Sequence, residues 1–553
     1  MPRTPQDEDE AEHQPLLRSP SPSPSSSVKS PGLTTSSESD DDSIGEVEVL
    51  RAIESDVLQE TATYGRNLNW WSAYILIMSR VIGSGIFATP GSIAKSVGSV
   101  GLTLVLWVVG AVISACGLAI TMEYGCMLPR SGGDKVYLEF TYRHPRFLAS
   151  TLVAMQAVIL GFTASNCIVF GEYVLFALDI EPTEFSQKAL AVGLLTIITI
   201  IHGCFLKTGI FIQNALGSIK IALCVFMGLT GLYVVIFRPN TASGAPPNTG
   251  VFGWDNLWKD SNWSWGIIST ALFKVFYSYA GLGNVNNVLN EVKNPVRTLK
   301  TVGPAALFSA CLLYLLVNVA YFVIVPIEEL KESRELVAAL FFEKVFGQGF
   351  GKTVLPLAIA ISGAGNVMVV TYAMARVNQE VARQGFLPYA SILASSRPFN
   401  APLGGLIVHY IPSLLVITLP PPGDVYTFIL DVEGYPGQFF VLASAVGVLL
   451  LRYRRPDLKR PFKAWIPAVF LQIAFCLALI SAPFFPPEGG QGDVDFFYAT
   501  YAIVGIGIII FAVLYWYIWT VALPRWRGYT LEEKVEVLPD GTSITKLVHI
   551  TPL

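Results

Sequence analysis

Charged residues and histidines are scarce in this sequence. Asp, Glu, Lys and Arg together make up 14% of its 553 residues, and it contains five histidines. We find no phosphate-binding glycine loop, no Ser/His/Asp arrangement and no group of residues at metal-ligand spacing, which are common sequence signals of enzymatic chemistry. We therefore predict that the chain is not an enzyme, has no catalytic residues and uses no cofactor or metal.

Cysteines are also few, and none are paired at metal-ligand spacing. All seven lie in or beside apolar runs: Cys116, Cys126, Cys167, Cys204, Cys224, Cys311 and Cys476. We interpret them as buried thiols that pack as small hydrophobic side chains. Because the first residues are acidic and polar, we expect no cleavable signal peptide.

Hydrophobic residues, in contrast, make up 52% of the chain, and the mean hydropathy is +0.52. This composition is typical of a protein that crosses a bilayer many times. Twelve apolar runs are near the length that a membrane-spanning helix needs: 71–97, 101–128, 147–178, 188–206, 210–237, 264–290, 301–326, 353–375, 402–420, 425–451, 464–485 and 496–523. We predict an all-α membrane protein with twelve transmembrane helices.

Composition divides the chain into three regions. Residues 1–65 are rich in Ser, Pro, Asp and Glu and are predicted to be a disordered tail, residues 66–523 hold the twelve helices, and residues 524–553 form a C-terminal tail. Loops on one side of the membrane carry most of the Lys and Arg, which predicts that both termini are cytoplasmic. Alternating residues around Pro539-Asp540-Gly541 predict a short hairpin in the C-terminal tail.

The N-terminal tail has features of a trafficking signal. Glu12 begins an acidic dileucine pattern that ends at Leu16-Leu17, and Lys29 is the only lysine of the tail. We expect trafficking adaptors and the ubiquitin machinery as partners of this segment.

The first apolar run contains Gly83-Ser84-Gly85 near its middle. Glycines weaken a helix there, and irregular backbone survives at membrane depth only where it lines a cavity or a site. If the helix breaks, the N–H groups of the second half favour a carboxylate, while the carbonyls of Val81 and Ile82 accept from an ammonium group. The alternative is that the glycines only allow another helix to approach closely.

The sixth run is interrupted in a similar way, at Tyr277, Ser278, Ala280 and Gly281. Interruptions in the first and sixth helices predict two inverted five-helix repeats, with the substrate bound between them. We therefore assign the substrate site to the residues around both interruptions: Val81, Ile82, Gly83, Ser84, Gly85, Tyr277, Ser278, Ala280 and Gly281.

Several motifs resemble the amino acid–polyamine–organocation superfamily. Gly83–Pro90 is similar to its first-helix signature, Leu128–Asp134 to its loop after helix 2, Glu291–Pro295 to its helix 6 exit and Arg452–Lys463 to its helix 10–11 loop. The resemblance covers about residues 70 to 523 and is greatest to L-type amino acid transporters, among them fungal methionine permeases. It implies a LeuT-type fold of five plus five helices with broken helices 1 and 6.

Two departures from the L-type pattern affect what the resemblance implies. Leu282 and Gly283 stand where L-type transporters often carry Trp-Asn, so the pocket and outer gate are expected to differ. The loop at residues 179–187 lacks the cysteine that bonds a heavy subunit in animal relatives, so we expect no disulfide-linked heavy subunit.

Two basic residues lie deep in the apolar runs. Lys220 is about ten residues into its run, which places it near mid-bilayer at ~1.5 Å per residue. The resemblance implies that Lys220 replaces a sodium ion between helix 1 and helix 8, near Ser362, and hence sodium independence and proton coupling. Arg80 precedes the glycine motif, and Glu123 and Glu291 are its expected inner-gate partners, with a fixed structural pair as the alternative.

The predicted side-chain pocket favours a neutral substrate. We expect it to contain Gln156, Ser165, Asn166, Tyr277, Tyr279 and Asn366 but no carboxylate, which disfavours lysine and arginine. Asp431 and Glu433, before an expected helix break at 434–437, are assigned to the outer vestibule or to a helix cap.

The sequence thus predicts a secondary transporter of neutral L-amino acids, methionine first, which works by alternating access. The plasma membrane is the expected location, with an endosomal or vacuolar membrane as the alternative. An exchanger of broader specificity and a non-transporting amino acid sensor remain open as alternative functions.

Overall fold

The structure is a computed structural model that describes residues 68–130, 132–237, 249–395, 399, 401–419, 425–486, 497–537 and 543–550. The predicted N-terminal tail, residues 1–65, with its dileucine pattern and Lys29, lies outside the described residues.

The described part of the chain contains ten helices that are long and apolar enough to cross a membrane. They are Trp70–Val97, Val100–Met127, Leu148–Ala177, Glu184–Cys204, Ala215–Phe237, Pro295–Ile324, Phe350–Arg383, Tyr426–Arg454, Ile466–Phe484 and Thr500–Arg527. Two further apolar helices, Trp265–Tyr279 and Leu403–Thr418, are shorter. A run of about twenty apolar residues spans the hydrocarbon core, so the chain is a multi-pass integral membrane protein.

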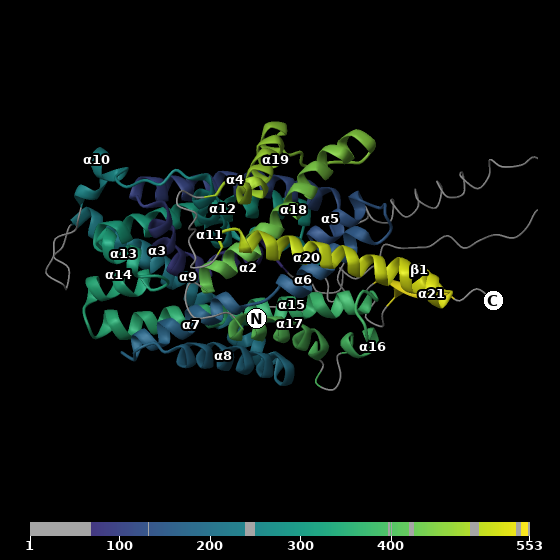
Figure 1. The fold of residues 1–553 in the computed structure, drawn as a ribbon, viewed down its shortest axis with the longest axis horizontal. Helices are drawn as coiled ribbons and strands as arrows, with labels where there is room; N and C mark the ends of the chain where they lie inside the picture. Colours follow the sequence, from purple (N-terminus) through teal and green to yellow (C-terminus); the bar gives the residue numbers. More distant parts are fainter. Residues whose placement is uncertain are drawn as a thin grey trace, which may run out of the picture. The chain divides into compact units, whose positions relative to one another are not determined.

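Figure 1 shows the helices in their order along the chain, coloured from purple to yellow. The first half of the chain forms α2 (Trp70–Val81), α3 (Gly85–Val97), α4 (Val100–Met127), α5 (Asp134–Thr141), α6 (Leu148–Leu160), α7 (Ala164–Ala177), α8 (Glu184–Cys204), α9 (Leu206–Phe237), η1 (Thr249–Phe252), α10 (Trp254–Leu257), α11 (Trp265–Tyr279) and η2 (Asn284–Glu291). The second half forms α12 (Pro295–Ile324), α13 (Ile327–Glu332), α14 (Val337–Phe346), η3 (Phe350–Val354), α15 (Leu355–Arg383), α16 (Ala390–Leu393), α17 (Leu403–Thr418), α18 (Val425–Arg454), α19 (Ile466–Ser481), η4 (Ala482–Phe484), α20 (Thr500–Tyr517), η5 (Ile518–Ala522), α21 (Leu523–Arg527), β1 (Thr530–Val537) and β2 (Ser543–Ile550).

The most enclosed helices surround the interruptions of the chain. In Trp70–Val97 and in Phe350–Arg383, 61% of the most apolar 18-residue stretch is buried inside the protein. In Thr500–Arg527 the buried share of that stretch is 17%, so most of its apolar side chains face outward. α3 packs against α11, and α15 packs against both α7 and α17 (Figure 1). The interruptions therefore lie inside the bundle, where their backbone is shielded from lipid.

One predicted break is wrong. α18 is continuous from Val425 to Arg454 and contains Gly434-Tyr435-Pro436-Gly437 in its interior. A proline removes one backbone donor from a helix, and neighbouring groups in a membrane protein can compensate for it.

The C-terminal tail contains two antiparallel strands, while the turn predicted at Pro539-Asp540-Gly541 lies outside the described residues. β1 and β2 pair antiparallel from Thr530 opposite Ile550 to Val537 opposite Ser543. The Leu547 amide donates to the Gln384 carbonyl at 3.1 Å, so the hairpin is attached to the end of α15.

Candidate functional site

The first predicted break is present, at Ile82–Ser84. α2 ends at Val81, after which the Ile82 amide donates to Met78 and the Gly83 amide donates to Val81, each at 2.9 Å. α3 then begins at Gly85. The first N–H groups of a helix have no partner within it, so the start of α3 presents amide donors and a partial positive charge.

Two tyrosines from other helices stabilise α3. Pro90 lies inside α3 and has no N–H group, so the Ile86 carbonyl lacks its donor four residues later. The Tyr321 hydroxyl donates to that carbonyl at 3.1 Å, and the Tyr173 hydroxyl donates to the Phe87 carbonyl at 2.7 Å. These bonds keep α3 in place after the break.

The second break follows α11. The helix ends at Tyr279, Ala280 is extended, and Gly281 has a φ of 106°. The chain then continues as the 3₁₀ segment η2. This differs from the first break, after which an α-helix resumes.

One hydroxyl joins the two breaks. Tyr314 of α12 lies 2.9 Å from the Val81 carbonyl and 2.8 Å from the Ser278 carbonyl, and both carbonyls accept from it. These carbonyls belong to the last residues of α2 and α11, where helical partners are missing. No sequence signal marked Tyr314, because it lies in an ordinary apolar run.

A third break, which we did not predict, interrupts the span that contains α6 and α7. α6 ends at Leu160 and α7 begins at Ala164, with Gly161, Phe162 and Thr163 between them. The Thr163 amide donates to the Ser413 hydroxyl of α17 at 3.3 Å. A single glycine in a long apolar run was too weak a signal for this break.

Tyr277 is the centre of the polar contacts between these segments. Its hydroxyl lies 3.0 Å from the Ser84 hydroxyl and 3.1 Å from the Ser165 hydroxyl, and it accepts from the Asn166 amide at 3.0 Å. Tyr277 thus connects α11 with the first and the third break.

A second set of contacts leads to Lys220. The Asn366 amide donates to Asn166 at 3.2 Å, and the Lys220 ammonium donates to the Asn366 amide oxygen at 3.4 Å. Lys220 is completely buried, as expected, and its bond reaches α15 at Asn366, one helical turn beyond Ser362, which is also buried. Asn366 lies next to Gly83, so it stands between Lys220 and the first break.

A small cavity of about 50 Å³ lies where these segments meet. It is lined by Arg80, Val81, Gly83, Gly85, Phe162, Ser165, Asn166, Tyr277, Ala280, Asn366, Val370 and Glu433. This volume holds a few water molecules and is much smaller than a typical ligand pocket of roughly 300 Å³ or more. A substrate therefore requires side chains to move apart.

Most of the predicted site residues meet at this cavity. Val81, Gly83, Gly85, Tyr277 and Ala280 line it. The other four support it from outside: Ile82 is buried, Ser84 contacts Tyr277, Ser278 contacts Thr89, and Gly281 packs against Arg80.

Four of the six residues expected in the side-chain pocket meet at the cavity. Ser165, Asn166, Tyr277 and Asn366 line the cavity. Gln156 and Tyr279 are not among the described residues that line it, and the Tyr279 hydroxyl instead donates to the Trp107 carbonyl.

The expectation that the pocket lacks a carboxylate is wrong. Glu433 of α18 lines the cavity together with Arg80. Sequence reasoning assigned Glu433 to the outer vestibule or to a helix cap, because Glu433 directly precedes the helix break that was wrongly expected at 434–437.

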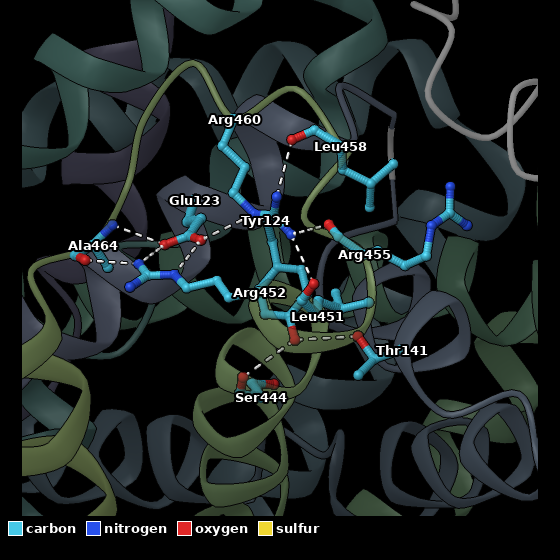
Figure 2. A network of polar contacts seen from close by, with 10 residues as sticks. All are labelled: Glu123, Tyr124, Thr141, Ser444, Leu451, Arg452, Arg455, Leu458, Arg460 and Ala464. Atoms are coloured by element: carbon cyan, nitrogen blue, oxygen red, sulfur yellow. Dashed lines mark hydrogen bonds and ion pairs between the residues drawn. The ribbon is translucent and has the colours of Figure 1, made fainter.

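The predicted pair between Arg80 and Glu123 is also wrong. The buried carboxylate of Glu123 binds Arg452, with 2.9 Å between Nε and Oε1, and it accepts from the Ala464 amide at 2.8 Å. Arg460 approaches the same carboxylate at 3.7 Å. Figure 2 shows these groups converging on Glu123 from α18 and from the loop after it.

This network fixes the loop at residues 455–465. Arg460 donates to the carbonyls of Leu451, Arg455 and Leu458, each at 2.9 Å (Figure 2). The hydrogen bond from Arg455 holds the pKa of the Asp457 carboxyl below its usual value. Glu123 is therefore occupied by a structural network that involves the basic loop.

Glu291, the other expected partner of Arg80, is held through its backbone. Its carbonyl accepts from the Leu68 amide at 2.9 Å, just before α2. Among the described residues no ion pair joins Glu291 to Arg80.

Comparison with known proteins agrees with this architecture. A family model described as "Amino acid permease" matches residues 68–511. The chain is 35% identical over 482 residues to the high-affinity methionine permease of Saccharomyces cerevisiae, covering 86% of this chain and 83% of that protein. It is 33% identical over 516 residues to the low-affinity methionine permease of the same yeast, covering 91% and 92%.

A more distant relative is the human b(0,+)-type amino acid transporter 1, which is 26% identical over 77% of this chain and 84% of its own length. The matches confirm the superfamily suggested by Gly83–Pro90, and they are named as permeases and transporters, not as enzymes. The chain belongs to the amino acid permease family.

Proposed function

We propose that this protein is a secondary active transporter of neutral L-amino acids, with methionine as the first substrate to test. The observation that carries the proposal is the cavity itself, which lies between two broken helices and is lined by Gly83 and Gly85. Two similar proteins are named methionine permeases, which supports this choice of substrate.

The two breaks supply groups for both charges of an amino acid. The substrate carboxylate would bind the first amides of α3, where the helix dipole favours an anion. The ammonium group would bind helix-terminal carbonyls, such as that of Ile82. The Val81 and Ser278 carbonyls already accept from Tyr314, but a carbonyl has two lone pairs and can accept a second bond.

The apolar part of the cavity suits a side chain such as that of methionine. Val81, Phe162, Ala280 and Val370 supply apolar atoms, while the polar groups gather around Tyr277 and Asn366. A pocket with this division fixes the backbone of the substrate through hydrogen bonds and its side chain through apolar contact.

The second part of the proposal is that amino acid uptake is coupled to protons and not to sodium. The Lys220 ammonium binds Asn366, which lies beside Gly83, and takes the place of a sodium ion there, and proton movement drives uptake. We expect Lys220→Met to lower uptake at least about tenfold, the factor that a loss of 1.4 kcal/mol gives.

The proposed topology has twelve spans. It adds α11 and α17 to the ten long helices, with inverted repeats of five helices, alternating access and both termini in the cytoplasm. We further propose the plasma membrane as the location and no disulfide-linked heavy subunit. Accessibility of single cysteines introduced at Lys188 and Arg455 tests the topology, because these positions should react from opposite sides.

The decisive experiment is uptake of labelled methionine by proteoliposomes that contain the purified protein. We expect saturable uptake that persists when choline replaces sodium and rises with an inward proton gradient. A requirement for sodium would overturn the role of Lys220. Uptake that depends on amino acid inside the vesicles would identify an exchanger, and binding without uptake would identify a sensor.

A further inference from the structure

The cavity is lined by two side chains of opposite charge, both of them partly buried. Arg80 and Glu433 are the two charged residues among the described residues that line it, and they come from α2 and α18, which are far apart in the sequence. Both line the same small cavity, so each charge lies close enough to act on the other. Their charges cancel, so the lining carries no net charge.

The stem of Arg80 is held in place by the second break. Gly281 packs so closely against Arg80 that a Cβ atom added to the glycine would lie 3.1 Å from the Cβ atom of the arginine. Lys220 carries another positive charge that acts on Arg80, but it does not line the cavity. Arg80 thus lines the cavity with its stem held against Gly281.

A low-dielectric cavity makes charge balance important. An ion is costly to remove from water unless an opposite charge compensates it, and removing one partner of a buried pair leaves the other uncompensated. A substrate with a charged side chain would enter a cavity whose charges already cancel. A neutral side chain enters the cavity without the free-energy cost of an uncompensated charge.

We propose that the Arg80–Glu433 pair determines the charge selectivity of the site and excludes amino acids with charged side chains. This inference rests on the proposed function, because it concerns the same substrate site. It assigns specificity to two residues that the similarity to other permeases does not assign.

The proposal predicts opposite effects for the two single substitutions. Arg80→Gln leaves Glu433 without its partner, so a cationic side chain such as that of lysine becomes acceptable. Glu433→Gln leaves Arg80 without its partner, so the anionic side chain of glutamate becomes acceptable. The double variant restores a cavity with no net charge and should again prefer neutral amino acids.

The experiment measures inhibition of labelled methionine uptake in proteoliposomes by unlabelled norleucine, lysine and glutamate. Norleucine serves as the neutral reference for all variants. We expect each single variant to shift the inhibition ratio of the newly accepted amino acid to norleucine by at least about tenfold, equivalent to 1.4 kcal/mol. Glu184→Gln and Arg383→Gln, at partly exposed ion pairs away from the cavity, are matched controls.

Binding provides a second readout if a variant no longer transports. The same amino acids are tested for thermal stabilisation of the purified protein in detergent, where a purely structural role of the pair would lower stability without reversing the charge preference. Unchanged preferences in both single variants would overturn the proposal. If neither single variant can be purified, inhibition of methionine uptake by the wild-type protein is measured instead. Lysine or glutamate that inhibits as strongly as norleucine would also overturn the proposal.

The two proposals can fail separately. If methionine stabilises the wild type but is not transported, the transport function fails, and charge selectivity is judged from stabilisation alone. If methionine is transported while the variants keep the wild-type charge preference, only the role of the Arg80–Glu433 pair fails.

Discussion

The two predicted breaks differ in how the chain continues after them. After Ile82–Ser84 the chain forms α3, an α-helix of 13 residues whose first amides lie at the cavity. After Tyr279 the chain passes through Gly281, with a φ of 106°, and then forms only the 3₁₀ segment η2. The first break presents a helix N-terminus, and the second places a glycine of positive φ against Arg80.

The glycines at the two breaks are therefore needed for different reasons. Gly281 has a left-handed conformation that other residues rarely adopt. Gly83 and Gly85 do not have a positive φ and are needed for space, Gly83 beside the Asn366 side chain and Gly85 beside the Ser278 backbone. Similar sequence signals thus correspond to three different physical requirements, which substitutions can separate.

Gly85→Leu should have the largest effect. A Cβ atom at this position would lie 2.8 Å from the Ser278 Cα atom, so a leucine would force α3 and α11 apart. We expect a loss of stability of about 3 kcal/mol, the upper end of the usual range for overpacking. The yield of monodisperse protein and its melting temperature measure this effect, and a wild-type melting temperature would contradict the assigned packing role.

Gly281→Ala should have the next largest effect. Alanine would be strained at the observed φ, at a cost of about 1–3 kcal/mol, and its Cβ atom would press against Arg80. We expect a lower melting temperature together with reduced methionine uptake.

Gly283→Ala is the matched control for that prediction. Gly283 has a φ of −82°, and a Cβ atom there would lie 3.6 Å from the nearest atom, in Asn286. If the two alanine variants lose equal stability, the second break does not depend on the left-handed conformation of Gly281.

The sequence was sufficient to locate the two breaks, because closely spaced glycines in a long apolar run weaken a helix where no water can bind the freed backbone. It was not sufficient to identify the third break, where Phe162 enters the cavity after a single glycine. It wrongly predicted a break at Gly434–Gly437, since a proline within a well-packed helix need not end it.

Charge partners were the least predictable feature. Arg80 and Glu433 meet only because α2 and α18 pack around the same cavity. Glu123 had several basic residues within reach in the loop after α18, and the bidentate geometry of Arg452 is visible only in the folded protein. Local sequence indicates that a buried charge needs a partner, but tertiary packing determines which one.

Tyr314→Phe tests the connection between the two breaks. The substitution removes the hydroxyl that both helix-terminal carbonyls share but keeps the ring contact with Trp107. Leaving a buried acceptor unsatisfied costs about 1–3 kcal/mol, so we expect a loss of that size in thermal stability. Tyr233→Phe, at an exposed tyrosine of α9, is the control, and an equal effect of both would show that Tyr314 does not join the breaks.

Gly83→Ala should have the smallest effect on stability and still impair transport. A Cβ atom at Gly83 would lie 2.8 Å from the Asn366 amide nitrogen, which belongs to a side chain that can move, and the backbone at Gly83 does not require glycine. We expect stability to change by less than about 1 kcal/mol, because a glycine-to-alanine change at a compatible position by itself stabilises a protein slightly.

Transport should respond differently, because Asn366 holds both Asn166 and Lys220 through its amide group. Displacing that group disturbs the contacts behind the first break and narrows a cavity of about 50 Å³. We expect methionine uptake to fall at least about tenfold, whereas Gly193→Ala, in α8 with no other atom within 4 Å of the added Cβ, should keep wild-type uptake. Wild-type uptake by Gly83→Ala would show that transport does not depend on the space at Gly83 or on the position of the Asn366 amide group.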